Sequence, residues 1–223
     1  MRIETTSITT LLFDWDGTLF DSDHRGFLAF QKTFDELGIS FDRQAYEACY
    51  SPNWYLMYEF LKLPRELWTQ ADDQWTVHYG EEPPLMVAGA QDTLSELNRR
   101  GYRMGVVSSG SQRRVRREIH QLSLTSLFHV VVCNEDIVNK KPHPEGLIKA
   151  ITTLDAPVDQ TCYVGDAPED IQMGKNARVM TIGVRSSYPS SRFLAQARPD
   201  INLEQIGGLL LHFPKDHLKI RSE

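Results

Sequence analysis

Short apolar runs alternate with amphipathic helical segments from residue 90 to residue 184, and this pattern constrains the fold more than any other feature. Strands that alternate with helices build βαβ units, in which helices cover both faces of a parallel sheet. We therefore predict an α/β fold with a Rossmann-like, doubly wound parallel sheet. The predicted strands are 102–107, 130–133, 161–164 and 179–184, and the predicted helices are 90–100, 113–122, 145–153 and 170–177.

A further strand is predicted at 9–13, and it leads directly into the motif DWDGT, which begins at Asp14. The motif places Asp14 and Asp16 at the carboxyl end of a buried strand, before a turn. Two acids in three residues repel one another unless a cation lies between them. The stretch therefore predicts a cation site at this edge of the sheet.

The segment 21–84 interrupts the α/β pattern with helical spacing and many aromatic residues. Phe27, Phe30 and Phe34 fall on one face of a helix. We predict a helical subdomain, the cap, at 21–84, and a core formed by 1–20 and 85–223. The run Glu81-Glu82-Pro83-Pro84 is expected to be a linker. Near the end of the chain, Ile201 could start an edge strand, 209–211 is expected to continue a helix that begins near Leu203, and the charged residues 215–223 are expected to fray.

Polar residues follow several of the predicted strands at their carboxyl ends. Because these ends meet at one edge of a parallel sheet, their side chains are expected to converge. Carboxylates are the ligands that Mg²⁺ prefers, and ammonium and N–H groups neutralise phosphate oxygens. The residues concerned are Asp14, Asp16, Ser108, Ser109, Lys140, Lys141, Asp166 and Asp170.

The segments FDWDGTLFDS, VVSSGS, NKKPHPE and VGDAPEDI resemble the four ordered motifs of the haloacid dehalogenase-like phosphohydrolases. The similarity runs from the first strand to about Val184. The helical insertion resembles the first (C1) cap type of that superfamily, as in phosphoglycolate phosphatases. The resemblance implies a Mg²⁺-dependent phosphatase that hydrolyses a small phosphomonoester through an aspartyl-phosphate intermediate.

By this resemblance Asp14 is the nucleophile, and Asp16 exchanges a proton with the leaving group and then with water. Mg²⁺ is held by the Asp14 carboxylate, the Asp16 backbone carbonyl and Asp166, with Asp170 as a further direct or water-mediated ligand. Asp170 could instead be only a first-turn acid of its helix, which the helix dipole favours.

The resemblance also implies phosphate-binding groups. Ser108 is expected to bind the phosphoryl group, together with the backbone N–H groups of Ser109 and Trp15. Lys141, which directly precedes Pro142, is expected to pair with both the phosphoryl group and Asp14. Ser108 could also cap the helix that follows it.

Other functions use related machinery. A phosphosugar mutase shares the core, but the histidine expected after Asp21 is replaced by Gly26. A haloacid dehalogenase usually lacks the second acid of the first motif, which is Asp16 here. A non-enzymatic binding protein would be expected to lose the nucleophile, the lysine or the metal acids, and all of these are present.

Composition narrows the partners and the compartment. A net charge of −6 argues against nucleic acid, and the apolar runs are too short for a membrane span. The partner is expected to be a small phosphorylated metabolite, and the chain a monomer or homodimer. Three scattered cysteines are expected to be buried thiols in a reducing cytoplasm.

Several side chains outside the motifs are assigned a structural role. The arginines of the predicted helix 113–122 are expected to form a solvated face rather than a site. Trp54 and Tyr55 could line the substrate entrance, and His24 is expected to be a surface or packing residue. The arginines are Arg113, Arg114, Arg116 and Arg117.

Overall fold

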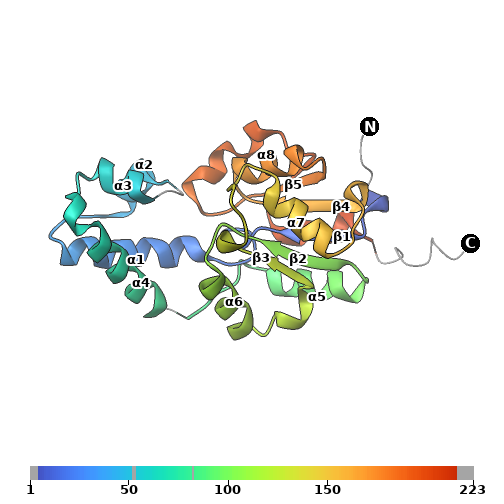
Figure 1. Ribbon diagram of the computed structural model, residues 1–223, viewed down its shortest axis with the longest axis horizontal. Helices are drawn as coiled ribbons and strands as arrows, with labels where there is room; N and C mark the ends of the chain where they lie inside the picture. Colours follow the sequence, from blue (N-terminus) through green and yellow to red (C-terminus); the bar gives the residue numbers. More distant parts are fainter. Residues whose placement is uncertain (1–4, 52–53, 82, 215–223) are drawn as a thin grey trace, which may run out of the picture.

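The computed structural model, which describes residues 5–51, 54–81 and 83–214, contains one six-stranded parallel sheet (Figure 1). Its strand order is β3-β2-β1-β4-β5-β6, so the chain winds outward from the centre in both directions. The predicted α/β, doubly wound fold is confirmed. The strands are β1 (Thr10–Phe13), β2 (Arg103–Val107), β3 (Val130–Val132), β4 (Thr161–Gly165), β5 (Met180–Val184) and β6 (Ile201–Leu203).

The first strand, β1, lies at the centre of the sheet. It pairs with β2 on one side and with β4 on the other, and Phe13 is in register with both Val106 and Val164. All four residues of β1 are buried, as expected for a strand covered on both faces. The residues that follow these three strands therefore emerge side by side at one edge of the sheet.

Helices pack on both faces of the sheet. Leu11 and Phe13 belong to a core shared with α5, α6 and α9, whereas Leu12 belongs to a core shared with α7 and α8. This division follows from the two-residue period of a strand. The helices are α5 (Ala90–Arg99), α6 (Gln112–Gln121), α7 (Glu145–Thr153), α8 (Pro168–Asn176) and α9 (Leu209–His212).

The carboxyl-terminal part differs in one respect from the prediction. Ile201 does start an edge strand, β6, which pairs with β5. Residues 209–211 do continue a helix, but its first turn, a 3-10 helix, begins at Ile206 rather than near Leu203, because Leu203 ends this strand. The ladder with β5 holds residues 201–203 extended, and this tertiary pairing overrides the helical spacing of the leucines. Residues 215–223 lie outside the described residues.

Four helices between β1 and α5 form a separate group beside the sheet (Figure 1). They enclose a hydrophobic cluster of their own that is rich in aromatic rings, including Phe34, Tyr46 and Tyr58. The described part of this segment contains helices and no strand. The cap boundaries 21–84 stay a prediction, and Glu82 of the expected linker lies outside the described residues. The helices are α1 (Ser22–Glu36), α2 (Arg43–Cys49), α3 (Trp54–Phe60) and α4 (Trp68–Glu81).

The two chain segments that join this group to the sheet run together. Phe20 and Met86 form an antiparallel bridge. The Asp21 amide donates to the Leu85 carbonyl at 2.9 Å, and the Val87 amide donates to the Leu19 carbonyl at 3.0 Å. The exit from the DWDGT motif is thus hydrogen-bonded to the return from the cap, so movement of one segment is coupled to the other.

Two further predictions concern the cysteines and the possibility of a membrane span. Cys49, Cys133 and Cys162 are all free and buried, as predicted. Within the part of the chain that the structure describes, every helix is too short or too polar to cross a bilayer.

The cap should depend on its own hydrophobic cluster for stability. We expect Phe34→Ala to lower the free energy of unfolding by about 3–5 kcal/mol, because the ring is fully buried and its removal leaves a cavity. Phe60→Ala is the matched control, since that ring is 61% exposed and its loss should change stability by about 0.5 kcal/mol or less. Urea unfolding of both variants measures the difference; equal effects would contradict a distinct cap core.

Candidate active site

Three buried carboxylates meet at the carboxyl edge of the sheet, and we call them the acidic cluster: Asp14, Asp166 and Asp170. Asp14 follows β1, Asp166 follows β4, and Asp170 lies in the first turn of α8. Each offers an oxygen that lies within 4.8 Å of the others. The convergence expected from the strand order is therefore present for these three side chains.

A lysine lies against the acidic cluster. The Lys141 ammonium donates to Asp14 Oδ1 and, at 2.7 Å, to Asp170 Oδ1. Burial alone would lower the pKa of Lys141, but the two carboxylates hold it well above its usual value. The loop before α7 delivers this side chain, and its Lys141–Pro142 peptide is cis. The predicted pairing of Lys141 with Asp14 is present, whereas Lys140 donates to the carbonyls of Asn134 and Ile137 instead.

Asp166 is held by two hydroxyl groups. Thr18 Oγ1 donates to Asp166 Oδ1 at 3.2 Å, and Ser186 Oγ donates to Asp166 Oδ2 at 2.6 Å. Gly17 brings the DWDGT turn onto this carboxylate. It has φ of 78°, and a Cβ at this position would overlap the Asp166 carboxylate. The glycine and threonine of the motif thus set the position of an acid 148 residues later in the chain.

The electrostatics of the cluster favour a bound cation. Burial raises the pKa of Asp14 to about 7, and the neighbouring Asp170 and Asp16 carboxylates add to this rise while Lys141 opposes it. Burial, Asp170 and Asp14 together raise the pKa of Asp166 well above its ordinary value. Three carboxylates face one ammonium, so positive charge is in deficit. Clustered carboxylate oxygens are donors that suit Mg²⁺.

Asp170 has structural partners as well. Its Oδ2 accepts a hydrogen bond from the Ala167 amide at 3.0 Å, which caps the start of α8. Its Oδ1 lies 3.2 Å from the Tyr163 hydroxyl in addition to the Lys141 contact. Both roles considered for Asp170, a first-turn acid and a member of the site, are therefore compatible with its position.

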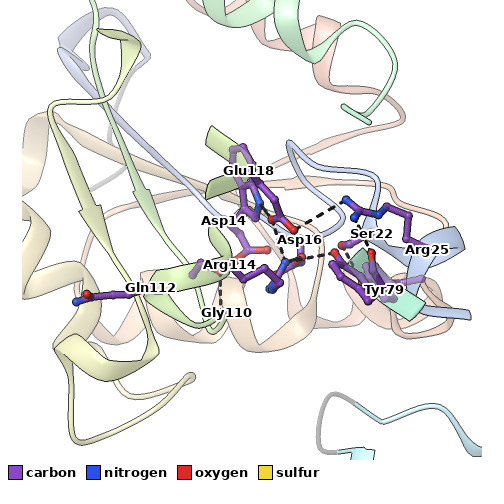
Figure 2. A network of polar contacts seen from close by, with 12 residues as sticks. Asp14, Asp16, Ser22, Arg25, Tyr79, Gly110, Gln112, Arg114 and Glu118 are labelled. Atoms are coloured by element: carbon purple, nitrogen blue, oxygen red, sulfur yellow. Dashed lines mark hydrogen bonds and ion pairs between the residues drawn. The ribbon is translucent and has the colours of Figure 1, made fainter. Parts of the chain in front are cut away.

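The side chain of Asp16 points to a different partner. Arg114 of α6 forms a bidentate ion pair with it, from Nη1 to Oδ1 at 2.8 Å and from Nη2 to Oδ2 at 2.6 Å (Figure 2). Burial would raise the pKa of Asp16, but the Arg114 charge and its hydrogen bonds outweigh burial and lower it. The expectation that Arg114 belongs to a solvated helix face is wrong, because α6 packs against the sheet with this residue turned toward the site. Arg113, Arg116 and Arg117 are exposed.

The Asp16–Arg114 pair continues into a buried network. Glu118 Oε2 accepts from Arg114 Nη1 at 3.1 Å and from the Trp15 indole at 2.8 Å. Glu118 Oε1 lies 4.0 Å from Arg25 Nη1 on α1, and Arg25 Nη2 donates to the Tyr79 carbonyl of α4 at 2.7 Å (Figure 2). This network connects the proton-transfer candidate Asp16 to two helices of the cap.

Ser108, Ser109 and Trp15, which were predicted to bind phosphate, lie just after the carboxyl ends of β2 and β1. The Ser108 hydroxyl is buried and accepts from the Gly110 amide at 2.9 Å, so it keeps its own proton as a donor. Ser109 is exposed and lines the cavity. The Trp15 ring is fully buried and stacks on Phe20 with centroids 5.4 Å apart, which fixes the backbone between Asp14 and Asp16. Their roles toward phosphate stay predictions.

A cavity of about 640 Å³ opens between the cap and the edge of the sheet. Its floor carries polar groups, and its cap side is lined by aromatic rings such as Trp54 and Trp75. Tyr55, also expected near the entrance, instead hydrogen-bonds Asp72, and His24 is exposed. The site residues among those that line the cavity are Asp14, Asp16, Ser109, Arg114, Lys141, Asp166 and Asp170.

Sequence reasoning missed Arg114, Ser186 and Tyr163. The sequence shows that Arg114 precedes Glu118 by four residues and so shares a helix face with it, but only the structure shows that Glu118 is buried. Ser186 lies two residues after the end of β5, and so close to a strand end, as Asp14, Ser108 and Asp166 do. Tyr163 lies inside a strand, and nothing in its sequence context distinguishes it from a core residue.

Comparison with known proteins places this architecture in a family. The family model for haloacid dehalogenase-like hydrolases matches residues 11–184. The pyrophosphatase PpaX of Listeria monocytogenes serotype 4b is 32% identical over 214 residues, which cover 92% of this chain and 96% of that protein.

Solved structures agree in fold. A predicted phosphoglycolate phosphatase from Haemophilus somnus 129PT superposes with a TM-score of 0.81 at 19% identity, covering 92% of this chain and 97% of the other. CbbY from Rhodobacter sphaeroides, solved with phosphate, has a TM-score of 0.75 at 23% identity, covering 91% and 96%. The chain belongs to the haloacid dehalogenase-like hydrolases and is an enzyme of their phosphatase type.

Proposed function

We propose that the protein is a Mg²⁺-dependent phosphatase that hydrolyses a small phosphomonoester through an aspartyl-phosphate on Asp14. The observation that carries this proposal is the position of Asp14. Its carboxylate ends the central strand, contacts Lys141, lies within the acidic cluster and borders the cavity. A nucleophile that forms a covalent intermediate divides one difficult displacement into two easier steps.

In the first step an Asp14 oxygen attacks the phosphorus, the bond from phosphorus to the leaving-group oxygen breaks, and Asp16, which acts here in its protonated form, gives its proton to that oxygen. In the second step a water oxygen attacks the phosphorus, Asp16 takes a proton from the water, and the bond between Asp14 and phosphorus breaks. Phosphate is released and both aspartates return to their starting states. Asp16 lies two residues from Asp14 on the same turn, which suits it to serve both steps.

Cationic and N–H groups around Asp14 would bind the phosphoryl oxygens. Lys141 is the buried cation next to the nucleophile, and its ammonium can bridge Asp14 and a phosphoryl oxygen. The Ser108 hydroxyl and the backbone N–H groups of Ser109 and Trp15 complete this set. Such donors are fixed in place by the strand ends, so little reorganisation accompanies the reaction.

The acidic cluster would hold Mg²⁺ through Asp14, Asp166 and the Asp16 carbonyl, with Asp170 as a direct or water-mediated ligand. The donor set fits a hard divalent cation, because the clustered oxygens carry more negative charge than Lys141 offsets. A bound Mg²⁺ would reduce the repulsion between Asp14 and an anionic substrate.

The substrate is a small phosphorylated metabolite. The curated relatives are named pyrophosphatases and a structural neighbour is described as a phosphoglycolate phosphatase, and both names denote small anionic substrates. A helical cap beside the site would exclude bulk water and select substrates by size. A cytoplasmic location and a monomeric or homodimeric state accompany this proposal as predictions.

Replacement of the nucleophile gives the most direct test. We expect Asp14→Asn to reduce hydrolysis of p-nitrophenyl phosphate by about 1,000-fold or more, because an amide cannot form the acyl phosphate. Asp159→Asn is the matched control, since Asp159 is exposed and precedes β4 at the opposite edge of the sheet. Retained activity in the Asp14 variant would overturn the mechanism. Conversion of a hexose 1-phosphate to its 6-phosphate without phosphate release would favour a mutase.

Mg²⁺ should stabilise the protein more at pH 8 than at pH 5. The folded pKa of Asp14, about 7, exceeds its unfolded value of 3.8, so its contribution to stability is complete below pH 3.8 and is lost as pH rises through 7. A cation binds the ionised carboxylates, so the stability gained from Mg²⁺ should be larger at high pH than at low pH.

Thermal melts with and without Mg²⁺ measure this effect. At about 100 times Kd the expected gain is about 2.7 kcal/mol, or roughly 5–10 °C for a chain of this size. Asp166→Asn should reduce the gain at pH 8, and Asp159→Asn should leave it intact. An equal or larger Mg²⁺ shift at pH 5 would contradict the predicted site.

A further inference from the structure

Arg114 occupies a position that the phosphatase chemistry described above does not use. Its guanidinium is mostly buried, with 19% of the side chain exposed, and it forms both of its shortest contacts with Asp16. It also lines the cavity. A bidentate ion pair between arginine and carboxylate is a strong interaction. It must therefore affect the ability of Asp16 to exchange a proton.

If Asp16 protonates the leaving group, Arg114 lies beside that group. Asp16 has to reach the leaving-group oxygen if it is to protonate it, and Arg114 is hydrogen-bonded to Asp16 at 2.6 and 2.8 Å. The guanidinium would then lie a few bond lengths beyond that oxygen. Arg113 and Arg117 on the same helix also line the cavity, so this wall is basic, while the cap wall is aromatic.

In the structure Arg114 engages both oxygens of Asp16 (Figure 2). An Asp16 oxygen that donates a proton to the leaving group cannot at the same time accept a hydrogen bond along the same direction from the guanidinium. Another acceptor for Arg114 would free both oxygens of Asp16 for this transfer. A carboxylate or phosphate oxygen on the substrate is such an acceptor, because arginine binds both groups in the same bidentate manner.

Neighbouring residues hold the Arg114 guanidinium in place, so that a substrate oxygen could replace Asp16 as its acceptor. Glu118 holds Nη1 from the other side at 3.1 Å, and the Tyr79 hydroxyl lies 3.4 Å from the same nitrogen. Gly110 leaves the space that the guanidinium fills, since a Cβ there would overlap Nη2. These contacts can anchor one edge of the guanidinium while the other changes partner, so Glu118 is a positioning residue.

We propose that Arg114 is a specificity-determining residue that binds a second acidic group on the leaving group of the substrate and thereby releases Asp16 for proton transfer. The substrate class is a phosphate ester or anhydride with a carboxylate or phosphate a few bonds from the bridging oxygen. This inference rests on the proposed function, because it assigns the substrate class of the same site.

Matched substrates test the proposal on the unmodified protein with Mg²⁺. Ethyl phosphate and 2-phosphoglycolate differ chiefly in the carboxylate, and pyrophosphate supplies a phosphate in its place. We expect kcat/KM for 2-phosphoglycolate or pyrophosphate to exceed that for ethyl phosphate by roughly 10- to 100-fold, the scale of a hydrogen-bonded charge pair. Whichever of these two substrates has the higher kcat/KM identifies the acidic group, carboxylate or phosphate, that Arg114 binds. Equal or lower values for both would overturn the proposal.

Variants then assign the preference to Arg114. Arg114→Gln should reduce the ratio of acidic to neutral substrate to about one, because the amide lacks the charge. Arg114→Lys should retain part of the ratio through its point charge. Arg116→Gln is the control, since Arg116 is exposed on the same helix and donates to the Val131 carbonyl. An unchanged ratio in Arg114→Gln, with both rates reduced equally, would overturn the role in specificity.

Failure of this inference can be separated from failure of the proposed function. Hydrolysis of p-nitrophenyl and ethyl phosphates without preference for an acidic leaving group overturns only the role of Arg114. The absence of phosphate release from every substrate in the presence of Mg²⁺ overturns both. If Arg114→Gln does not fold, as judged by circular dichroism, the ratios of the unmodified protein and of Arg114→Lys still decide the outcome.

Discussion

The close approach of three buried carboxylates at the edge of the sheet is the constraint on which the site depends. Like charges repel strongly in a medium of low polarity, and burial alone disfavours each ionised carboxylate. The structure offsets this cost with the Lys141 ammonium on Asp14 and Asp170, and with hydroxyl groups on Asp166. The remaining deficit of positive charge is what makes the cluster a candidate for a divalent cation and a phosphate-binding floor.

A second set of charges connects this floor to the cap. Asp16, Arg114, Glu118 and Arg25 alternate in sign from the DWDGT turn to α1, and Tyr79 joins the same network from α4. Such a chain of buried charges is costly if any member loses its partner. The position of the cap and the environment of Asp16 are therefore linked by charge as well as by the paired segments around Phe20 and Met86.

Much of the fold and part of the site follow from local patterns. The strands could be located because short apolar runs buried in a parallel sheet are distinctive, and Asp14, Asp166 and Lys141 could be brought together because strand ends share one edge. The helix expected from Leu203 begins later, at Ile206, because pairing with β5 holds residues 201–203 extended. All four arginines of α6 were expected to face solvent, because composition alone does not tell which of them turns inward.

The sequence by itself determined the order of the strands along the chain, the helical insertion after the first strand and the chemical types gathered at the site. These features depend on periodicity and on the polar residues that directly follow each strand. Only the tertiary structure decided the pairings across the chain: Arg114 with Asp16, Ser186 with Asp166, and Glu118 with Trp15. Those pairings depend on the rotation of α6 about its axis and on the paths of loops, which are set by packing between distant segments.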